Sequence, residues 1–248
     1  MFGKKIDTFI IRFISHDRNL KTENQLEKDS LLNDRPTNLS NFNKFIERAG
    51  ARFSWRGSTI LDVCCGEGDL ARSLAKNGAK EVYGVDIQSK HISLADRIAN
   101  KEEISNVHFI KSDFYDFNVN KKFDYVISYE ILDHIPNTEA ALKKMVSFVK
   151  DNGKLIVFTS AFWGSPLADH CSGFMKFFIP WRHLIFNEDA LLKVRREKFR
   201  PTDDGKSFSD IRGGLSKYLF TDYYNSIKKL GLKVEVDECN YQFKYVYN

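Results

Sequence analysis

Short apolar runs alternate with amphipathic stretches through the middle of the chain. The runs TILDV, EVYGVD, NVHFIKSD, FDYVISYE and GKLIVFTS have the length and composition of buried strands. Residues 68–77, 89–100 and 138–150, which lie between them, have the periodicity of helices. Strands that alternate with such helices need crossover connections. The pattern therefore predicts an α/β fold with a Rossmann-like, mostly parallel open sheet and helices on both faces.

The last part of the chain predicts two further strands. A helix is expected at 221–230, because Gly231 stops the apolar period there. After it, LKVEVDE and YQFKYVY alternate apolar with polar residues, as the two arms of a hairpin do. We therefore expect seven strands, of which the last two form a C-terminal antiparallel hairpin.

Two segments lie outside this regular pattern. Residues 1–57 are polar with a few aromatics, and we expect an N-terminal helical segment that packs on the core, with its best helix at 38–49. Residues 161–217 have no regular period and predict an insertion after the fifth strand. The expected organisation is the N-terminal segment followed by one domain at 58–248 that contains this insertion.

The composition is that of a globular protein, with 42% hydrophobic and 29% charged residues in a chain of 248. Four cysteines show neither CxxC spacing nor a paired secretory pattern, so we expect a reduced, cytoplasmic protein. A net charge of +5 is too small to argue for nucleic acid by itself. The oligomeric state is not indicated.

The first residues of the chain form a basic amphipathic pattern. Apolar residues recur at helical spacing, and Lys4, Lys5 and Arg12 lie outside that stripe. Such a helix can lie on a membrane surface. We favour a helix that caps the domain and keep peripheral membrane contact as the alternative.

A glycine loop follows the first strand. The sequence GEGDLA, from Gly66 to Ala71, matches the dinucleotide fingerprint G-x-G-x-x-G/A, and Asp86 lies 20 residues after Gly66, where a ribose-binding acid is expected. In an open parallel sheet, the ligand binds at the carboxyl ends of the strands. The loop is therefore interpreted as part of a nucleotide-binding site.

The charges of the loop distinguish between nucleotides. Asp62, Glu67 and Asp69 are acidic, and no Lys or Arg precedes Arg72. Two like charges a few ångströms apart repel by roughly 4 kcal/mol at an effective dielectric constant near 20. A diphosphate would be repelled, whereas a ligand with a sulfonium and an ammonium group and no phosphate would be attracted.

The ordered runs ILDVCCGEGDLA, YGVDI, KSDFYDF and FDYVISYEILDHIP resemble the motifs of class I S-adenosylmethionine-dependent methyltransferases. The similarity is greatest to the small-molecule branch that includes quinone-biosynthesis O-methyltransferases. It covers residues 59–160, with a weaker similarity in LFTDYYNSIKKLGLKVEV. The resemblance implies that the cofactor is S-adenosyl-L-methionine, that S-adenosyl-L-homocysteine is the product, and that 58–248 is the methyltransferase domain.

The resemblance also implies which residues bind the cofactor. Asp62 would organise the loop around the methionine part, Asp86 would accept the ribose hydroxyls, and Asp113 would accept the adenine amino group. Glycines would let the backbone approach the cofactor, because a Cβ there would collide with it. The complete set is Asp62, Cys64, Gly66, Gly68, Asp86, Ile87, Asp113, Phe114 and Tyr129.

Cys64 departs from the family pattern, which usually has glycine at this first loop position. We interpret the site as altered in detail and retained. Cys64 and Cys65 are predicted to be structural, because free cysteine behaves as a small buried hydrophobe and no partners stand at metal-ligand spacing. No metal is expected.

The sequence favours a small-molecule acceptor. After the fourth strand it reads SYEILDHIP, unlike the (N/D)PP(Y/F) motif of amino-methylating nucleic-acid enzymes, and Cys171 is too distant to match RNA C5-type enzymes. We expect methylation of oxygen by in-line transfer. His134 is a candidate base, with a structural role as the alternative, and His170 after Asp169 is a second candidate.

The insertion at 161–217 is expected to cover the acceptor. Its nine Phe and Trp residues and its cations suit an acidic, sugar-like or aromatic or isoprenoid acceptor, with Trp181, Arg182 and His183 as substrate-binding candidates. PTDDGKSFSDIRGG is predicted to be a mobile loop and a lid. Two alternatives stay open: an RNA methyltransferase that uses the basic run at 193–200, and a non-catalytic binder that keeps the fold.

Overall fold

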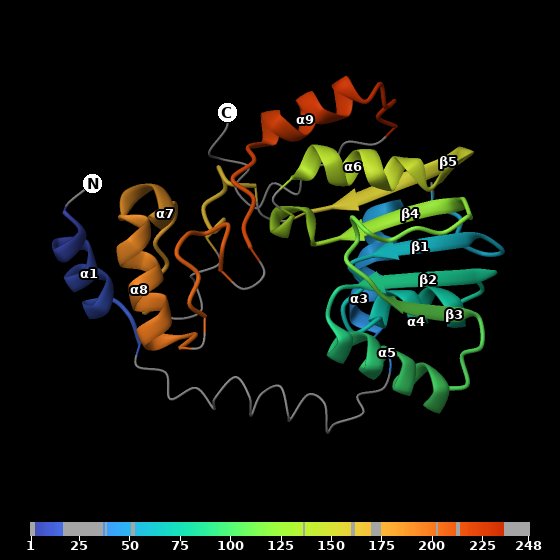
Figure 1. Cartoon of the computed structure of the whole chain (residues 1–248), viewed down its shortest axis with the longest axis horizontal. Helices are drawn as coiled ribbons and strands as arrows, with labels where there is room; N and C mark the ends of the chain where they lie inside the picture. Colours follow the sequence, from blue (N-terminus) through green and yellow to red (C-terminus); the bar gives the residue numbers. More distant parts are fainter. Residues whose placement is uncertain are drawn as a thin grey trace.

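The structure is a computed structural model of the 248-residue chain (Figure 1). It describes residues 3–16, 37, 39–50, 53–135, 137–159, 162–169, 175–201, 203–211 and 214–235.

A five-stranded parallel sheet forms the centre of the larger part of the molecule. Its strands lie in the order β3-β2-β1-β4-β5, and every pair is parallel. The strand order reverses between β1 and β4, because the chain adds β2 and β3 on one side of β1 and β4 and β5 on the other. The prediction of a parallel Rossmann-like sheet is thus confirmed. The strands are β1 (Thr59–Val63), β2 (Glu81–Asp86), β3 (Val107–Lys111), β4 (Phe123–Tyr129) and β5 (Val149–Phe158).

The prediction of seven strands is wrong. Residues 232–235, the start of the expected hairpin, are not a strand in the structure, and residues 236–248 lie outside the described residues. The chain turns after the preceding helix at Gly231, which has φ +65°. An ion pair of 2.5 Å joins Glu235 to Lys154 of β5. An alternating pattern indicates that a segment is able to pair as a strand, but it does not show that the segment does pair.

Helices cover both faces of the sheet. One face carries α3 (Leu39–Ala49), α4 (Asp69–Lys76) and α5 (Ser89–Lys101). The other carries α6 (Thr138–Ser147) and α9 (Phe220–Lys229), as Figure 1 shows. Successive strand residues point to opposite faces, so Ile60 packs beneath α3 and α4 while Leu61 packs on the side of α6.

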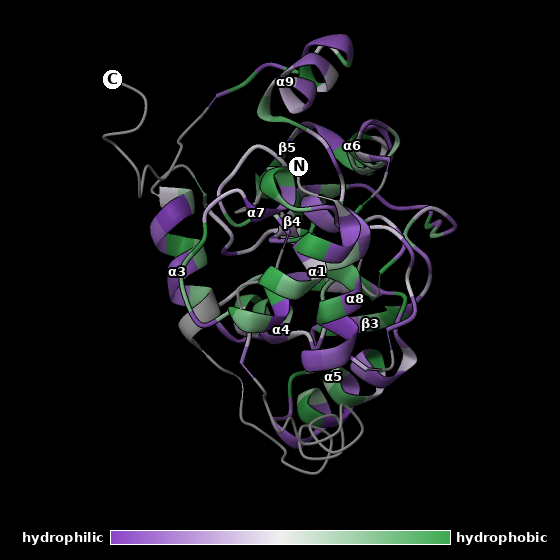
Figure 2. Cartoon of the chain, turned by 90° about the vertical axis from the view of Figure 1, so that its left-hand side faces the viewer, coloured by the Kyte–Doolittle hydropathy of each residue, from purple (hydrophilic) through white to green (hydrophobic). Residues whose placement is uncertain are grey.

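The N-terminal helix and the insertion share a separate hydrophobic core. α1 (Lys4–Phe13) packs against α8 (Glu188–Lys198), and the short α7 (Arg182–Ile185) precedes α8. These helices lie together at one end of the molecule, away from the sheet (Figure 1), and Figure 2 views the molecule from that end. Among the described residues, no helix is both long and apolar enough to cross a membrane. The side chains of this second core include Ile11, Phe186, Leu191, Phe208 and Ile211.

The predicted mobile loop is packed onto α8. Asp203 forms a buried ion pair with Arg195 of α8, and the carbonyl oxygen of Gly205 accepts a hydrogen bond of 2.7 Å from Arg196. Phe208 is fully buried. A Cβ on Gly205 would overlap the backbone of Ile211, so the turn is tight. The described residues 203–211, whose glycine and polar side chains suggested mobility, instead form a close-packed turn.

Candidate functional site

Three carboxylates lie at the carboxyl edge of neighbouring strands. Asp62 belongs to β1, Asp86 ends β2, and Asp113 follows β3 by two residues. In the sheet, Asp62 stands opposite Gly84 of β2 on one side and Ile127 of β4 on the other. This edge, where the strand order reverses, is where open α/β sheets bind ligands.

Asp86 holds the glycine loop. Its Oδ2 accepts a hydrogen bond of 2.9 Å from the Gly66 amide, and its Oδ1 accepts one of 2.8 Å from the Gln88 amide. The Nδ1 atom of His91 lies 3.6 Å from Oδ1. Burial by itself would raise the pKa of Asp86, but the interactions with His91, Gln88 and Gly66 outweigh it and lower the pKa. Asp86 is therefore an anion at neutral pH.

Asp62 is buried and is not fully hydrogen-bonded. Its carboxylate is 2% exposed, and Oδ2 has no hydrogen-bond partner among the described residues. Burial, and then the negative charge of Asp86, raise its pKa from 3.8 to about 7. An orphaned carboxylate oxygen at this depth needs a donor or a cation. The site is built to receive a positively charged or hydrogen-bond-donating group beside Asp62.

Glycine stands at the two loop positions for different structural reasons. Both have positive φ, +53° at Gly66 and +74° at Gly68. A Cβ at Gly66 would meet nothing within 4 Å, so this position faces open space where a ligand can approach. A Cβ at Gly68 would overlap the Phe109 ring and touch Ala95. The expected collision with the cofactor thus fits Gly66, whereas at Gly68 the space is filled by the protein's own helix and sheet packing.

Cys64 occupies a backbone conformation that favours glycine. Its φ is +57°, which explains why a glycine suits the first loop position and why another residue there carries strain. Burial, together with the charges of Asp86, Asp62 and Asp113, raises the pKa of its thiol to about 12. The thiol is therefore neutral and a poor nucleophile or metal ligand. No group of metal-ligating residues occurs in the described part of the chain.

The expected adenine side of the site is open. Ile87 next to Asp86 is 59% exposed, an unusual state for a large aliphatic side chain. Asp113 Oδ1 accepts a hydrogen bond of 2.8 Å from the Tyr115 amide. Phe114 is buried in the core and packs near Phe148, so it holds the segment after β3 against the core.

Arg72 neutralises part of the negative charge of the glycine loop. It is buried, pairs with Asp69 at 2.7 Å, and donates to the Glu67 carbonyl and to Thr37. Asp69 therefore adds less negative charge to the site than the sequence suggested. The i,i+3 spacing of Asp69 and Arg72 on one helix was the signal for this pair. The acidity that a ligand meets comes from Asp62, Asp86 and Asp113.

Tyr129 ends β4 and packs against α3. Its ring packs edge-on against Phe45 of α3, and its hydroxyl accepts a hydrogen bond of 3.3 Å from Arg48. Ser128, one residue earlier, is fully buried, and its Oγ lacks a partner among the described residues. Ser128 is opposite Val63 in the sheet register, next to Asp62. Ser128 was not predicted as a site residue, because a single serine inside an apolar strand does not indicate a functional role.

His134 lies beyond the end of β4, in a 3-10 turn at Leu132–His134. Its Nδ1 is 2.9 Å from the carbonyl oxygen of Gly214, and its Nε2 is 3.6 Å from Asp133 Oδ2. A carbonyl only accepts, so Nδ1 carries the proton in the neutral ring and Nε2 has the lone pair. Asp133 is buried beside it. The arrangement can accept a proton.

The residues predicted to bind substrate lie in the second core. Arg182 and Asp169 are both fully buried and form an ion pair of 2.6 Å. His183 is buried, and its Nε2 is 2.7 Å from the Trp163 carbonyl. Trp181 donates through Nε1 to the Gly164 carbonyl at 2.9 Å. The structure gives each of them a partner within the insertion. The other candidate base, His170, lies outside the described residues.

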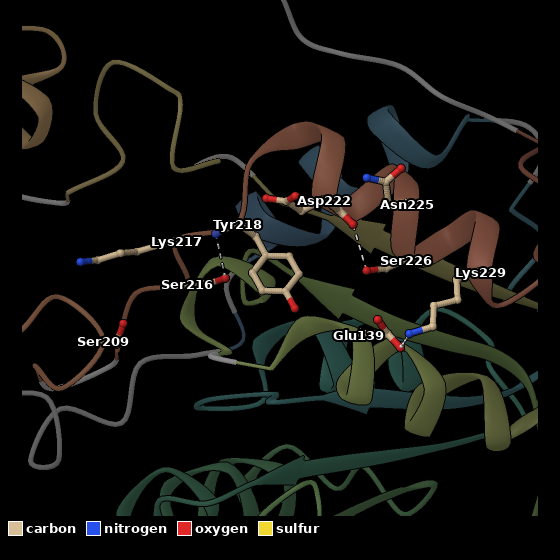
Figure 3. A pocket seen from close by; sticks show the side chains of 9 residues that line it. All are labelled: Glu139, Ser209, Ser216, Lys217, Tyr218, Asp222, Asn225, Ser226 and Lys229. Atoms are coloured by element: carbon tan, nitrogen blue, oxygen red, sulfur yellow. Dashed lines mark hydrogen bonds and ion pairs between the residues drawn. The ribbon is translucent and has the colours of Figure 1, made fainter.

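A groove of about 570 Å³ opens between α6, α9 and the segment that leads into α9 (Figure 3). Its walls are polar, and Glu139 and Lys229 form an ion pair of 2.7 Å across it. The amide of Ser216 donates to the Asp133 carbonyl at 2.6 Å, so one end of the groove adjoins the His134 turn. The lining residues are Glu139, Ser209, Ser216, Lys217, Tyr218, Asp222, Asn225, Ser226 and Lys229.

The parallel sheet is Rossmann-like, and Asp62, Asp86 and Asp113 make the carboxyl edge of its strands acidic. Residues 55–175 match the family model described as a methyltransferase domain. The chain is 32% identical over 117 residues to the ubiquinone biosynthesis O-methyltransferase of Coxiella burnetii, covering 47% of this chain and 48% of that protein. It is 33% identical over 103 residues to phosphoethanolamine N-methyltransferase 2 of Caenorhabditis elegans, covering 41% and 23%.

The match of residues 55–175 to a methyltransferase domain agrees with the motifs, which resemble those of class I S-adenosylmethionine-dependent methyltransferases. Solved structures agree on the fold: the YcgJ protein of Bacillus subtilis has a TM-score of 0.54 at 14% identity, covering 77% of this chain and 68% of that one. A proposed methyltransferase of Bacillus halodurans has a TM-score of 0.54 at 16% identity, covering 79% and 71%. The chain spans about half or less of the length of the curated relatives it matches.

The comparisons do not support the RNA alternative, and the structure uses the basic run at 193–200 internally. Arg195 pairs with Asp203, and Arg196 donates to the Gly205 carbonyl. These two arginines of the run therefore contact the segment that follows α8, whereas Lys193 is exposed.

Proposed function

We propose that the chain transfers a methyl group from S-adenosyl-L-methionine to an oxygen atom of a small molecule. The observation that carries the proposal is the buried carboxylate of Asp62, which has an unpartnered oxygen beside a glycine loop that faces open space. When bound, the cofactor supplies an electrophilic methyl group on a sulfonium. The protein supplies the position of the two reactants and a place for the proton that the acceptor loses.

The residues present fit such a cofactor. Asp62 would bind the cationic methionine end, Asp86 would accept the ribose hydroxyls, and Asp113 would accept the adenine amino group. Ile87 gives an exposed apolar surface for the adenine ring. No arginine or lysine is available for a diphosphate in the loop, because Arg72 is buried in its pair with Asp69. This charge pattern supports a sulfonium nucleoside over a dinucleotide.

Oxygen as the acceptor atom is supported by the quinone-biosynthesis relatives and by His134. The lone pair on Nε2 next to Asp133 suits removal of a hydroxyl proton. The N-methyltransferase relative, at similar identity, makes nitrogen the competing acceptor atom. A nitrogen acceptor would be less sensitive to loss of His134, because an amine attacks through its own lone pair.

We further propose that the acceptor enters from the groove of Figure 3, beneath the insertion at 161–217. Tyr115 supports the connection. Burial is the largest cause that raises the pKa of Tyr115. Its pKa is also raised by Asp113 and Cys64, which lie on the cofactor side, and by Tyr218, which lines the groove. The groove is lined by hydroxyl, amide and charged groups, which suit a hydroxylated or acidic acceptor.

The test measures cofactor binding and methyl transfer separately. S-adenosylhomocysteine at about 100 times its dissociation constant should stabilise the full chain by roughly 2.7 kcal/mol. Asp86→Asn should remove that shift, whereas Asp124→Asn, at the opposite edge of the sheet, should keep it. A shift with NAD and none with S-adenosylhomocysteine would refute the proposal. Incubation with labelled S-adenosylmethionine and metabolite fractions, followed by mass spectrometry, identifies the acceptor.

A further inference from the structure

The N-terminal helix α1 turns a row of large apolar side chains away from the protein. Ile6, Phe9 and Phe13 share one face of the helix, and the two phenylalanines are 71% and 73% exposed. The opposite face buries Asp7 and Ile11 against α8. A helix that only capped the domain would bury its phenylalanines and expose its aspartate.

Polar contacts fix this orientation. Asp7 Oδ2 accepts a hydrogen bond of 2.8 Å from the Asn187 amide, immediately before α8. Lys4 pairs with Asp189 at 2.8 Å. Arg12 makes two hydrogen bonds to Glu197, of 2.7 and 2.5 Å. Rolling the helix to bury its phenylalanines would break all of these contacts, so the outward row is a built feature of the fold.

The insertion extends the same surface. Lys176 donates to the Phe13 carbonyl at 2.8 Å, and its ammonium lies 5.6 Å from the centre of the Phe13 ring. The next two residues, Phe177 and Phe178, are exposed. Figure 2 views the molecule from this end, with α1 in front. We name Ile6, Phe9, Phe13, Phe177 and Phe178 the apolar face.

The apolar face has a basic border. Within the described residues, neither Lys5 nor Lys176 forms an ion pair with a carboxylate. The acids nearby are already occupied, because Asp189 pairs with Lys4 and Glu197 pairs with Arg12. Large apolar side chains bordered by uncompensated lysines are typical of a surface that lies in the headgroup region of a bilayer.

We propose that the apolar face docks this protein on the surface of a membrane that contains anionic phospholipids. The lysines would meet lipid phosphates while the phenylalanines enter the boundary between headgroups and acyl chains. A second copy of the chain fits less well, because a symmetric contact would bring the two basic borders together. The proposal concerns the location of the protein and does not depend on the proposed methyl transfer.

The test is sedimentation of the full chain with phosphatidylcholine vesicles, with and without phosphatidylglycerol. Binding is expected with phosphatidylglycerol and should weaken in high salt. The double variant Phe9→Ser/Phe13→Ser should lower the partition coefficient at least tenfold, and Lys5→Gln and Lys176→Gln about fivefold each. The control Tyr224→Ser/Val234→Ser, which removes two exposed apolar side chains elsewhere, should bind like the wild type.

Absence of binding by the folded wild type would overturn the proposal, as would equal binding by Phe9→Ser/Phe13→Ser. Dimerisation that this variant abolishes, without vesicle binding, would assign the apolar face to a second copy. Far-UV circular dichroism and melting curves show that each variant is folded. Binding of S-adenosylhomocysteine in the same samples reports separately on the proposed function.

Discussion

Asp62→Asn should make the free protein more stable and unable to bind its cofactor. The change keeps the shape of the side chain and removes a negative charge from a site where the carboxylate is 2% exposed. The folded state raises the pKa of Asp62 from 3.8 to about 7, so between these values the folded protein holds a proton that the unfolded chain has released. The wild type therefore loses stability as the pH rises through this window, and the loss is complete above the folded pKa.

The size of the effect follows from the shift. Each pKa unit is worth 1.36 kcal/mol, so the ionised carboxylate costs the folded state about 4 kcal/mol at most. Between about pH 5 and about pH 8, the wild type should lose about 2 to 3 kcal/mol relative to Asp62→Asn. Urea unfolding of both proteins at several pH values in this window measures the difference. A difference that stays constant with pH would refute the reasoning.

Asp124→Asn is the matched control. Asp124 lies at the opposite edge of the sheet, where burial is outweighed by hydrogen bonds from Lys150 and Thr59 that lower its pKa to about 2. The stability it contributes is present above the unfolded pKa and is lost only in acid as the pH falls toward 2. The difference between this variant and the wild type should therefore not change between about pH 5 and about pH 8. S-adenosylhomocysteine should stabilise Asp124→Asn and not Asp62→Asn.

Five further substitutions test other parts of the structure. Cys64→Gly should relieve the left-handed strain and raise the free energy of unfolding by about 1 kcal/mol in urea titrations, with cofactor binding kept; a loss of stability would contradict this. Gly68→Ala should cost about 2 kcal/mol or more because the new methyl overlaps Phe109, while Gly66→Ala should mainly weaken binding of S-adenosylhomocysteine in calorimetry. Arg182→Met should cost about 3 to 5 kcal/mol by leaving Asp169 unpaired; an unchanged melting temperature with a raised KM for the acceptor would instead support its predicted substrate role. His134→Asn should lower kcat about 100-fold or more for an oxygen acceptor, and an unchanged kcat would make the histidine structural.

The central fold and the cofactor edge were predictable because they depend on local sequence order. A short buried strand followed by a helix, repeated along the chain, requires a parallel sheet, and its carboxyl edge then brings Asp62, Asp86 and Asp113 together. The left-handed conformation of Cys64 was signalled by the glycine that the family usually has there. These features follow from residues that are close in sequence or from a topology with few alternatives.

The insertion could not be predicted in the same way, because its partners are distant in sequence. Trp181, Arg182 and His183 are the kinds of residue that bind substrates, and nothing local reveals that Arg182 pairs with Asp169 in a separate core. The partner of α1 is α8, about 180 residues later, so the sequence could not report which face of α1 is buried. The start of the predicted hairpin, residues 232–235, is not a strand, because alternation alone does not determine whether a segment pairs.

The pairing of α1 with α8 also sets an order on the folding of the chain. The ribosome synthesises α1 first, but the residues that bury Asp7 and Ile11 are synthesised only after the whole sheet. Contacts of such large sequence separation form late, because a long loop must close before they contribute. The α/β domain can therefore fold before α8 is available, and until then both faces of α1 are exposed to solvent. Although α1 is made before the sheet, its packing is completed after the sheet has formed, and during that interval α1 is a natural target for chaperones.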